Sequence, residues 1–257
     1  MSFALITGAS KGIGKAIALQ LASRKKDLLL IARSEAQLQA LCSDVRNRFG
    51  VIAHYHALDL SDKEASRKVY DWCQQNAYEV DVLVNNAGYG LSGGFDKYSL
   101  EEHLNMMQLN MNVVIELTYL FLPSLKKHAR AYILNVASSA AYQAVPFMSL
   151  YAASKAFVLQ FSRGLHFELG KTNVSVTCVS PGATDTAFVD RAQIGPKGLD
   201  LAKKFNMQPD EVAKIAVEAM YKGRTEVIVG FLNKLGAALA WLLPKKTIEK
   251  TSAKIYQ

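Results

Sequence analysis

Cysteine is scarce in this chain of 257 residues, which holds three, odd in number and far apart. Cys42, Cys73 and Cys178 therefore predict neither a disulfide framework nor a cysteine metal site. The five histidines have no ligand-like spacing, so we expect no metal. The chain opens on a short apolar run without a basic leader, and we expect no secretory signal. A cytoplasmic protein fits these absences.

Long hydrophobic runs are also missing. The apolar stretch Leu235–Leu243 is well short of the ~20 residues that span a bilayer. It lies between Gly230 and a lysine-rich end that follows Pro244. We expect residues 231–257 to form a C-terminal helical extension that packs on its own fold or on a second subunit, with no membrane partner. A helix lying on a membrane surface is the alternative.

A dense basic stripe with interleaved aromatic residues is absent too. The formal net charge is +8, which could serve a nucleic acid, a membrane surface, or an anionic cofactor and substrate. Because the basic residues are scattered along the chain, we expect no nucleic-acid partner. A phosphate-rich cofactor matches the charge better.

No internal repeat, low-complexity tract or linker divides the chain, so we expect a single domain over residues 1–257. Seven short apolar runs, rich in Val, Ile or Leu and largely continuous, predict strands that are covered on both faces. They are Phe3–Thr7, Leu28–Ala32, Val51–Ala57, Val80–Val84, Ala131–Val136, Val174–Val179 and Val227–Val229.

Segments with helical spacing lie between these strands, such as the stretch from Glu101 to Lys127. Gly50 and Gly170 stand where C-terminal helix caps are expected. Alternation of strands and helices indicates parallel βαβ units. We therefore predict an α/β fold, a Rossmann-type doubly wound parallel sheet of about seven strands flanked by helices, with ligands bound at the carboxyl ends of its strands.

The first predicted strand runs directly into the glycine-rich turn Thr7-Gly8-Ala9-Ser10-Lys11-Gly12-Ile13-Gly14, and a helical segment follows. In such a turn one glycine allows the tight bend, one lets the backbone approach a pyrophosphate, and one packs the helix on the strand. The free N–H groups of the helix N-terminus suit phosphates. The spacing G-x-x-x-G-x-G matches the general dinucleotide pattern only in part, so the position between strand and helix carries the prediction.

The second predicted strand ends in Ile31-Ala32-Arg33-Ser34, where an NAD-binding unit is expected to carry an acidic residue for the ribose 2′-hydroxyl. The residue here is basic, and Lys11 adds a cation in the phosphate loop. Arg33 can hold a 2′-phosphate with its planar guanidinium. We predict NADP(H) as the cofactor; solvated surface charges are the alternative for both residues.

The segment Tyr151-Ala152-Ala153-Ser154-Lys155 places a phenol and an ammonium four residues apart, on one face of a helix. A phenol with a pKa near ~10 is a poor proton shuttle at neutral pH, but a nearby cation lowers that pKa. The pair alone is weak, because such pairs arise by chance in many helices. Asn85-Asn86-Ala87-Gly88, Ser138-Ser139 and Pro181-Gly182 each follow a predicted strand, so they converge with the glycine turn on one rim of the sheet.

In the order and spacing of these motifs the sequence resembles the short-chain dehydrogenase/reductase family along nearly the whole chain. The resemblance implies that Tyr151 is the general acid/base, and that Lys155 holds the ribose hydroxyls and lowers the pKa of the tyrosine. It implies that Ser138 hydrogen-bonds the substrate oxygen and that Asn110 holds a proton-relay water. The substrate would thus contact Ser138 and Tyr151.

Two of these roles have a neighbouring alternative, Ser139 for Ser138 and Asn112 for Asn110. A strand-end cap, a satisfied buried amide and a plain helix signal are the structural alternatives for Ser138, Asn110 and Asp59. The resemblance also implies that Asp59 contacts the adenine and that Thr186 meets the carboxamide. The complete predicted cofactor set is Gly8, Ser10, Lys11, Gly12, Ile13, Gly14, Arg33, Asp59, Leu60, Asn86, Ala87, Gly88, Tyr151, Lys155, Pro181, Gly182, Thr184 and Thr186.

The segment after Pro181-Gly182 is long and lacks a clear period, which predicts a substrate lid over residues 183–208. Apolar residues in the lid and near the tyrosine favour a substrate with an apolar body, although ordinary packing would explain any single one. They are Phe188, Val189, Ile194, Leu199, Leu201, Phe205 and Met207 in the lid, and Tyr142, Phe147 and Met148 near the tyrosine.

We therefore predict an NADP(H)-dependent oxidoreductase that transfers a hydride between the nicotinamide and a carbonyl/alcohol substrate. A non-catalytic protein that senses NADP(H) is the alternative from another class. A sugar-nucleotide epimerase would need a larger substrate region than this chain supplies. The resemblance also implies a homodimer or homotetramer formed through the helix from Tyr151 to Leu169.

Overall fold

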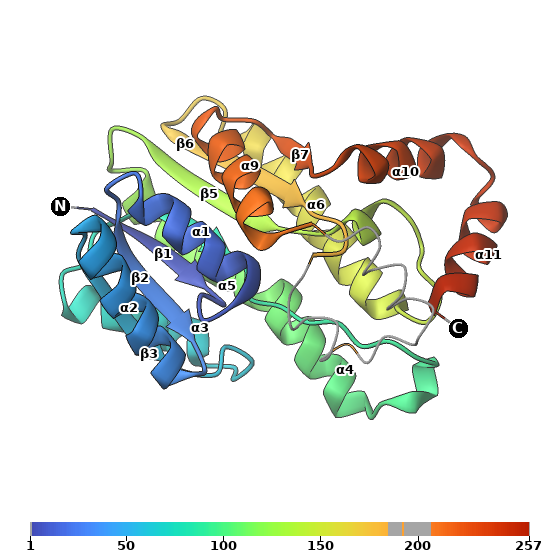
Figure 1. Ribbon diagram of the computed structural model, residues 1–257, viewed down its shortest axis with the longest axis horizontal. Coiled ribbons are helices and arrows are strands. Elements are labelled where there is room, and N and C mark those ends of the chain that lie inside the picture. The colour runs from blue at the N-terminus through green and yellow to red at the C-terminus, as the bar shows by residue number, and fades with distance from the viewer. Residues whose placement is uncertain (1, 185–191, 193–206, 257) are drawn as a thin grey trace.

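A computed structural model describes residues 2–184, 192 and 207–256, and Figure 1 shows a sheet with helices on both sides. The strands lie within two residues of the predicted bounds, and the first and fifth match them at both ends. They are β1 Phe3–Thr7, β2 Asp27–Ala32, β3 Ala53–Ala57, β4 Val80–Asn85, β5 Ala131–Val136, β6 Val174–Ser180 and β7 Glu226–Ile228.

The sheet has the order β3-β2-β1-β4-β5-β6-β7, and every neighbouring pair is parallel. From β1 the chain builds outward to β3, then returns to add β4 on the other side of β1. The strand order therefore reverses between β1 and β4, which is where a doubly wound fold binds its ligand. This arrangement confirms the predicted fold class.

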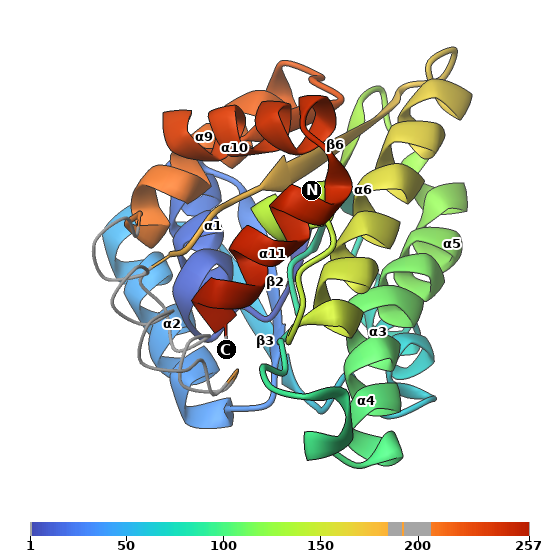
Figure 2. The ribbon, with the colours of Figure 1, turned by 90° about the vertical axis from the view of Figure 1, so that its right-hand side faces the viewer.

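Helices cover both faces of the sheet (Figure 2), with α1, α2 and α9 on one face and α3, α5 and α6 on the other. Their apolar residues form two buried clusters against the strands, and all five residues of β1 are buried. The α-helices are α1 Gly12–Ala22, α2 Glu35–Phe49, α3 Ala65–Gln75, α4 Leu100–Met107, α5 Val113–Leu125, α6 Ser149–Glu168, α9 Pro209–Tyr221, α10 Phe231–Leu242 and α11 Lys245–Tyr256.

The stretch from Glu101 to Lys127 is not the continuous helix that its spacing suggests. A five-residue π-helix, Gln108–Asn112, joins α4 to α5. Such wide turns occur mostly as insertions within α-helices, often at functional sites. Here the π-helix leaves Asn110 1% exposed in the interior and Asn112 on the surface.

The two predicted glycine caps differ. Gly50 ends α2 with φ of +66°, a left-handed conformation that favours glycine. Gly170 lies one residue beyond Leu169, which caps α6, and its N–H donates to the carbonyl of Phe167 at 3.2 Å. The helix that bears Tyr151 thus ends where the sequence predicts.

Most of the predicted lid, residues 185–191 and 193–206, lies outside the described residues. With it go Thr186 and every predicted apolar lid residue except Met207. Met207 pairs with Thr184 in a parallel bridge, and its N–H donates to the carbonyl of Ala183 at 3.0 Å. These two contacts join the ends of the predicted lid.

The C-terminal residues form α10 and α11, which lie at the end of the molecule opposite the N-terminus (Figure 1). No helix in the described part of the chain is long and apolar enough to cross a membrane. The large leucines of α10 range from 39% exposed at Leu239 to 67% at Leu242, so this helix packs on the chain's own fold in part. Within α10 the small residue Ala240 is buried, whereas Trp241 is 80% exposed.

Candidate active site

The glycine-rich turn passes from β1 into α1 in a shape that requires its glycines. Gly8 and Gly12 have φ of +65° and +58°. A side chain on Gly14 would collide with the carbonyl of Gly8 and the amide of Asn86. Lys11 is the N-cap of α1, and no side chain caps the helix. The first N–H groups of α1 therefore have no side-chain acceptor and face the turn as donors for an anion.

The end of β4 is tied to the end of β1 beneath this turn. The Thr7 hydroxyl accepts hydrogen bonds from the N–H groups of Asn86 and Ala87 at 2.9 and 3.0 Å. The Asn86 amide donates to the carbonyls of Thr7 and Gly8 at 2.9 and 3.2 Å. Asn86 thus holds the turn in place with its side chain, at the position where the strand order reverses.

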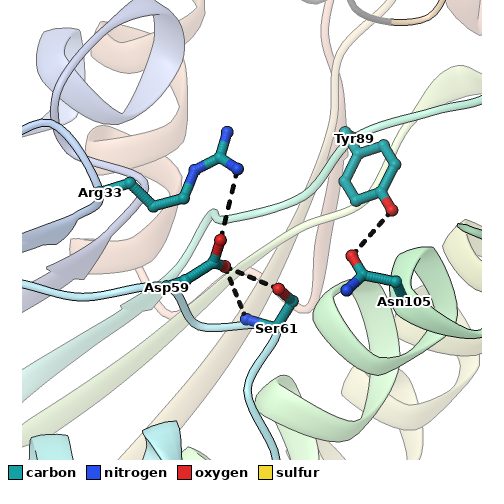
Figure 3. Close-up of polar contacts among 5 residues, drawn as sticks. All are labelled: Arg33, Asp59, Ser61, Tyr89 and Asn105. Atoms are coloured by element: carbon teal, nitrogen blue, oxygen red, sulfur yellow. Dashed lines mark hydrogen bonds and ion pairs between the residues drawn. The ribbon is translucent and has the colours of Figure 1, made fainter.

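Arg33, just after β2, lies opposite Asp59, just after β3, as Figure 3 shows. The Arg33 Nη1 atom is 3.4 Å from Asp59 Oδ2, and both side chains are exposed. Asp59 Oδ1 also accepts hydrogen bonds from the N–H and hydroxyl of Ser61 at 3.0 and 2.7 Å. Partial burial raises the pKa of Asp59, but the Ser61 hydrogen bonds and the Arg33 charge outweigh it, so the net pKa is lowered.

Tyr151 and Lys155 lie one turn apart on α6 and are both buried, at 8% and 5% exposure. The Lys155 Nζ atom donates to the carbonyl of Val136 at 2.9 Å, and it lies 5.9 Å from the centre of the Tyr151 ring. Burial lowers the pKa of Lys155 to about 8, because the charged form loses its hydration. The ammonium form still predominates at neutral pH.

Ser138 stands between the end of β5 and a short 3-10 helix, Ser139–Tyr142. Its hydroxyl accepts a hydrogen bond from the N–H of Ala140 at 3.1 Å, so it caps this helix. The hydroxyl oxygen has a second lone pair, and its own proton remains to be donated. The capping contact therefore leaves Ser138 able to bind a ligand oxygen.

Asn110 contacts the same region from the π-helix. Its amide donates to the Tyr89 carbonyl and the Ser154 hydroxyl at 2.9 and 3.0 Å, and its oxygen accepts from the Tyr89 N–H at 3.1 Å. A side chain on Gly88 would lie 2.9 Å from Asn110 Oδ1 and 3.3 Å from Lys155 Nζ. Asn110 and Lys155 thus meet across Gly88.

Tyr89 and Asn112 complete the surroundings of Asn110. The Tyr89 hydroxyl donates to Asn105 Oδ1 at 2.9 Å (Figure 3), which anchors the chain after β4 to α4. Asn112 is exposed, and its amide donates to Gln108 at 2.6 Å. Of the two asparagines that the sequence leaves open, Asn110 is therefore the one that contacts the site.

A cavity of about 860 Å³ joins the glycine turn to Tyr151. Gly14 and Asn110 lie behind its wall, and Thr186 is outside the described residues. Every other predicted catalytic and cofactor residue lines it. Tyr142 and Met148 line it as well, but Phe147 does not. Among the described residues no cluster of side chains could hold a metal ion.

The sequence reasoning missed the wall that the C-terminal helices contribute. Gln143 donates to the hydroxyl of Ser252 at 2.9 Å, which ties α11 to the loop after Ser138. The signal that could have identified this wall is the recurrence of small residues at helical spacing in the apolar run of α10. The cavity-lining residues from the two helices are Leu232, Asn233, Gly236, Ala237, Ser252 and Ile255.

Comparisons with known proteins agree with this geometry. The model of the short chain dehydrogenase family matches residues 2–195. Ketoacyl reductase HetN of Nostoc sp. is 34% identical over 248 residues, which are 93% of this chain and 84% of that protein. The very-long-chain 3-oxoacyl-CoA reductase of Anas platyrhynchos is 35% identical over 188 residues, 70% of this chain and 59% of that protein.

Among solved structures, a short-chain dehydrogenase from Sphingobium yanoikuyae in complex with NADPH is similar to this chain with a TM-score of 0.82. The two are 30% identical, and the match covers 94% of this chain and 95% of the other. Because the family model matches well over half of the residues, the chain belongs to the short-chain dehydrogenase family of oxidoreductases.

Proposed function

We propose that this chain is an NADP(H)-dependent reductase of carbonyl substrates with an apolar body, and that 3-oxoacyl thioesters are its substrate class. The observation that carries the proposal is the continuous cavity, which has the glycine turn at one end and Ser138, Tyr151 and Lys155 at the other. A protein that only senses the cofactor would not need those three side chains around one space. We therefore favour an enzyme.

The described residues fit a dinucleotide with a 2′-phosphate. Gly8 and Gly12 give the turn its left-handed bends at the cavity, and the uncapped start of α1 offers N–H donors to a pyrophosphate. Arg33 and Lys11 line the same end of the cavity and would hold the 2′-phosphate. The nicotinamide, when bound, supplies the hydride in reduction and accepts it in oxidation.

Tyr151 would move the proton. In reduction its hydroxyl donates a proton to the carbonyl oxygen, where negative charge builds up, and in oxidation it takes the proton back. The Lys155 ammonium, 5.9 Å from the ring, stabilises the phenolate that remains. Ser138 would donate a hydrogen bond to the same substrate oxygen. Asn110 would act from behind, since it holds the chain beside Gly88 and Lys155 in place.

Two observations support the substrate class. Beyond Tyr151 the cavity is bounded by apolar side chains from several elements, including Val145, Met148 and Ile255. These suit a long apolar chain better than a sugar. The names of the two curated relatives, a ketoacyl reductase and a very-long-chain 3-oxoacyl-CoA reductase, point to the same chemistry.

A substrate panel tests the function. The purified protein is mixed with NADPH or NADH and with 3-oxoacyl thioesters of increasing chain length, simple ketones or aldehydes, and loss of the reduced nicotinamide absorbance is followed. We expect NADPH to be consumed fastest with the longer thioesters. Faster turnover of a small polar ketone would contradict the substrate class. Tight NADPH binding without turnover of any carbonyl would contradict the enzyme itself.

We also propose a homo-oligomer that forms through α6, as the family resemblance implies. Phe167 on that helix is 88% exposed and would be covered in such an interface. A cytoplasmic setting is proposed with it, because Cys42, Cys73 and Cys178 are all free and buried.

A further inference from the structure

Helix α10 carries its large apolar side chains on the outside. Phe231, Leu235, Leu239 and Leu242 are 77%, 46%, 39% and 67% exposed, and they recur every three or four residues. At 3.6 residues per turn these four fall on one face of the helix. We call them the α10 stripe. A helix of a folded domain normally turns such a face inward.

The inner face of α10 explains the reversal. Gly236 and Ala237 line the cavity, and Ala240 is buried. The side of α10 that faces the cavity and the fold thus carries small residues, and the large apolar ones lie on the other side. Within the described part of the chain, the α10 stripe is therefore only partly covered, most at Leu239 and least at Phe231.

Helix α11 also has two different faces, one toward the cavity and one, rich in lysine, toward solvent. Ser252 and Ile255 line the cavity, whereas Lys246, Lys250 and Lys254 are exposed. These lysines are spaced four residues apart and fall on one face of α11, so we call them the lysine row. Residues 231–257 contain five lysines against one glutamate.

We propose that α10 and α11 dock the protein on a membrane surface rich in anionic lipid. The α10 stripe would enter the boundary between headgroups and acyl chains, and the lysine row would bind the phosphates. Trp241, 80% exposed on α10, suits the same depth, where tryptophan is enriched. Figure 2 shows both helices at one end of the molecule, with α11 crossing in front of the sheet.

Charge favours lipid over a second copy of this chain. In a two-fold contact the same patch meets itself, so the α10 stripe would bring two copies of this lysine-rich segment together. Within the segment only Glu249 could neutralise them. An anionic lipid surface supplies a negative charge for each lysine and an apolar layer for the stripe.

Vesicle binding by the full chain tests the proposal. The chain has two tryptophans, so Trp72→Phe leaves Trp241 as the reporter, and Trp72 stacks on His56 away from α10. Vesicles of phosphatidylcholine alone are compared with vesicles of equal parts phosphatidylcholine and phosphatidylglycerol. We expect a blue shift of Trp241 emission and co-sedimentation with the anionic vesicles, both weakened by salt because screening reduces the attraction.

Two variants separate charge from apolar contact. Lys246→Gln/Lys250→Gln/Lys254→Gln should lower the affinity for anionic vesicles by a factor on the order of a hundred. Its control, Lys63→Gln/Lys68→Gln/Lys126→Gln, removes the same charge from exposed lysines elsewhere and should bind almost as the parent does. Leu235→Ser/Leu242→Ser should abolish the blue shift. Its control is Leu100→Ser/Leu104→Ser, at two exposed leucines on α4.

Three outcomes would overturn the proposal. The parent could fail to bind anionic vesicles at low salt, it could bind both vesicle types equally, or the lysine control could lose as much affinity as the lysine-row variant. Light scattering tests the alternative, in which α10 contacts a second copy of the chain. If the parent does not bind vesicles but is an oligomer, and Leu235→Ser/Leu242→Ser is a monomer, α10 joins two copies of the chain.

Discussion

Two walls of the cavity are built in opposite ways. The cofactor wall, formed by the glycine turn and α6, buries Tyr151 and Lys155 at 8% and 5% exposure. The C-terminal wall, formed by α10 and α11, has small residues inside and the α10 stripe outside. In the first wall the buried Lys155 ammonium has an acceptor within the chain, the Val136 carbonyl. In the second wall, part of the apolar surface of α10 is exposed and could be covered by another molecule.

The difference teaches that two walls of one cavity can be stabilised in different ways, one by buried polar contacts and the other by a partly exposed apolar helix. A change in the cofactor wall should alter reaction or folding, because its groups are buried and in contact. A change in the C-terminal wall should have little effect on turnover or on the free energy of unfolding. Each experiment below pairs a residue from one wall with a residue from the other or from the surface.

The largest effect is expected for Tyr151→Phe, which keeps the ring but removes the transferable proton. Turnover should fall by ~10²–10⁴-fold, the usual contribution of a positioned acid, while the NADPH dissociation constant changes little. Ser252→Ala in the C-terminal wall should leave turnover within a few-fold of the parent, since it loses only the contact with Gln143. Steady-state kinetics and cofactor titration measure both. Equal losses of turnover in Tyr151→Phe and Ser252→Ala would contradict the expected difference between the two walls.

Lys155→Met should change stability in a pH-dependent way. The folded pKa of Lys155, about 8, lies below its unfolded value of 10.5, so burying the charge destabilises the fold fully below pH 8. This penalty shrinks as pH rises and is gone above 10.5. The shift corresponds to about 3 kcal/mol, partly offset by the lost bond to Val136.

Urea unfolding without cofactor, at pH 7 and at pH 10, is the measurement. Lys155→Met should be more stable than the parent at pH 7, and the gain should be smaller at pH 10. Lys250→Met in the exposed lysine row should shift the free energy of unfolding by no more than about 0.5 kcal/mol at either pH. A gain for Lys155→Met that is independent of pH would show that packing, not charge, is responsible.

Arg33→Asp should reverse or abolish the preference for NADPH. A charge-assisted hydrogen bond contributes roughly 1.5–3 kcal/mol, so the ratio of NADH to NADPH dissociation constants should fall by about 10- to 100-fold. Arg67→Asp, at an exposed arginine on α3, is the control for net charge. Fluorescence titration with each cofactor gives the ratio. Equal affinities for NADPH and NADH in the parent would contradict the assignment.

A pair of glycine changes has the smallest expected effects, and they are opposite in sign. Gly14→Ala places a methyl group against the Gly8 carbonyl and should destabilise the fold by about 1–3 kcal/mol. Gly236→Ala has nothing within 4 Å and lies inside α10, so it should stabilise that helix by up to ~1 kcal/mol. Urea unfolding measures the effect of Gly14→Ala, and amide exchange in α10 measures the effect of Gly236→Ala. If both variants were less stable than the parent, there would be no room for a side chain in either wall.

The sheet and the positions of the motifs were predictable because their signals are local. Continuous apolar runs identify β1 and β5 to the residue, and the turn from Gly8 to Gly14 is read from consecutive positions. The parallel order follows from strand and helix alternation. Convergence of Asn86, Ser138 and Pro181 then follows from the fold class, whereas the role of Tyr151 on α6 was implied by the family resemblance.

The rest depended on contacts between distant residues. Gln143 and Ser252 are 109 positions apart, and no short pattern announces their hydrogen bond. The apolar residues of Gln108–Asn112 do not distinguish this π-helix, which places Asn110 in the interior, from a regular α-helix. Hydrophobicity indicated where α10 lies but not which of its faces points inward, because its inner face is small rather than large.

In the ion pair of Arg33 and Asp59, the carboxylate occupies the guanidinium that we propose as a phosphate ligand. The lowered pKa keeps Asp59 ionised at neutral pH, so the guanidinium already has an anionic neighbour at 3.4 Å before any phosphate arrives. In the proposed NADP(H) complex, the 2′-phosphate would have to displace the Asp59 carboxylate from Arg33, and the two anions would repel each other. Under the proposed function, the Asp59 carboxylate would therefore lower the affinity for the phosphate while giving Arg33 a partner beside the cavity in the free protein.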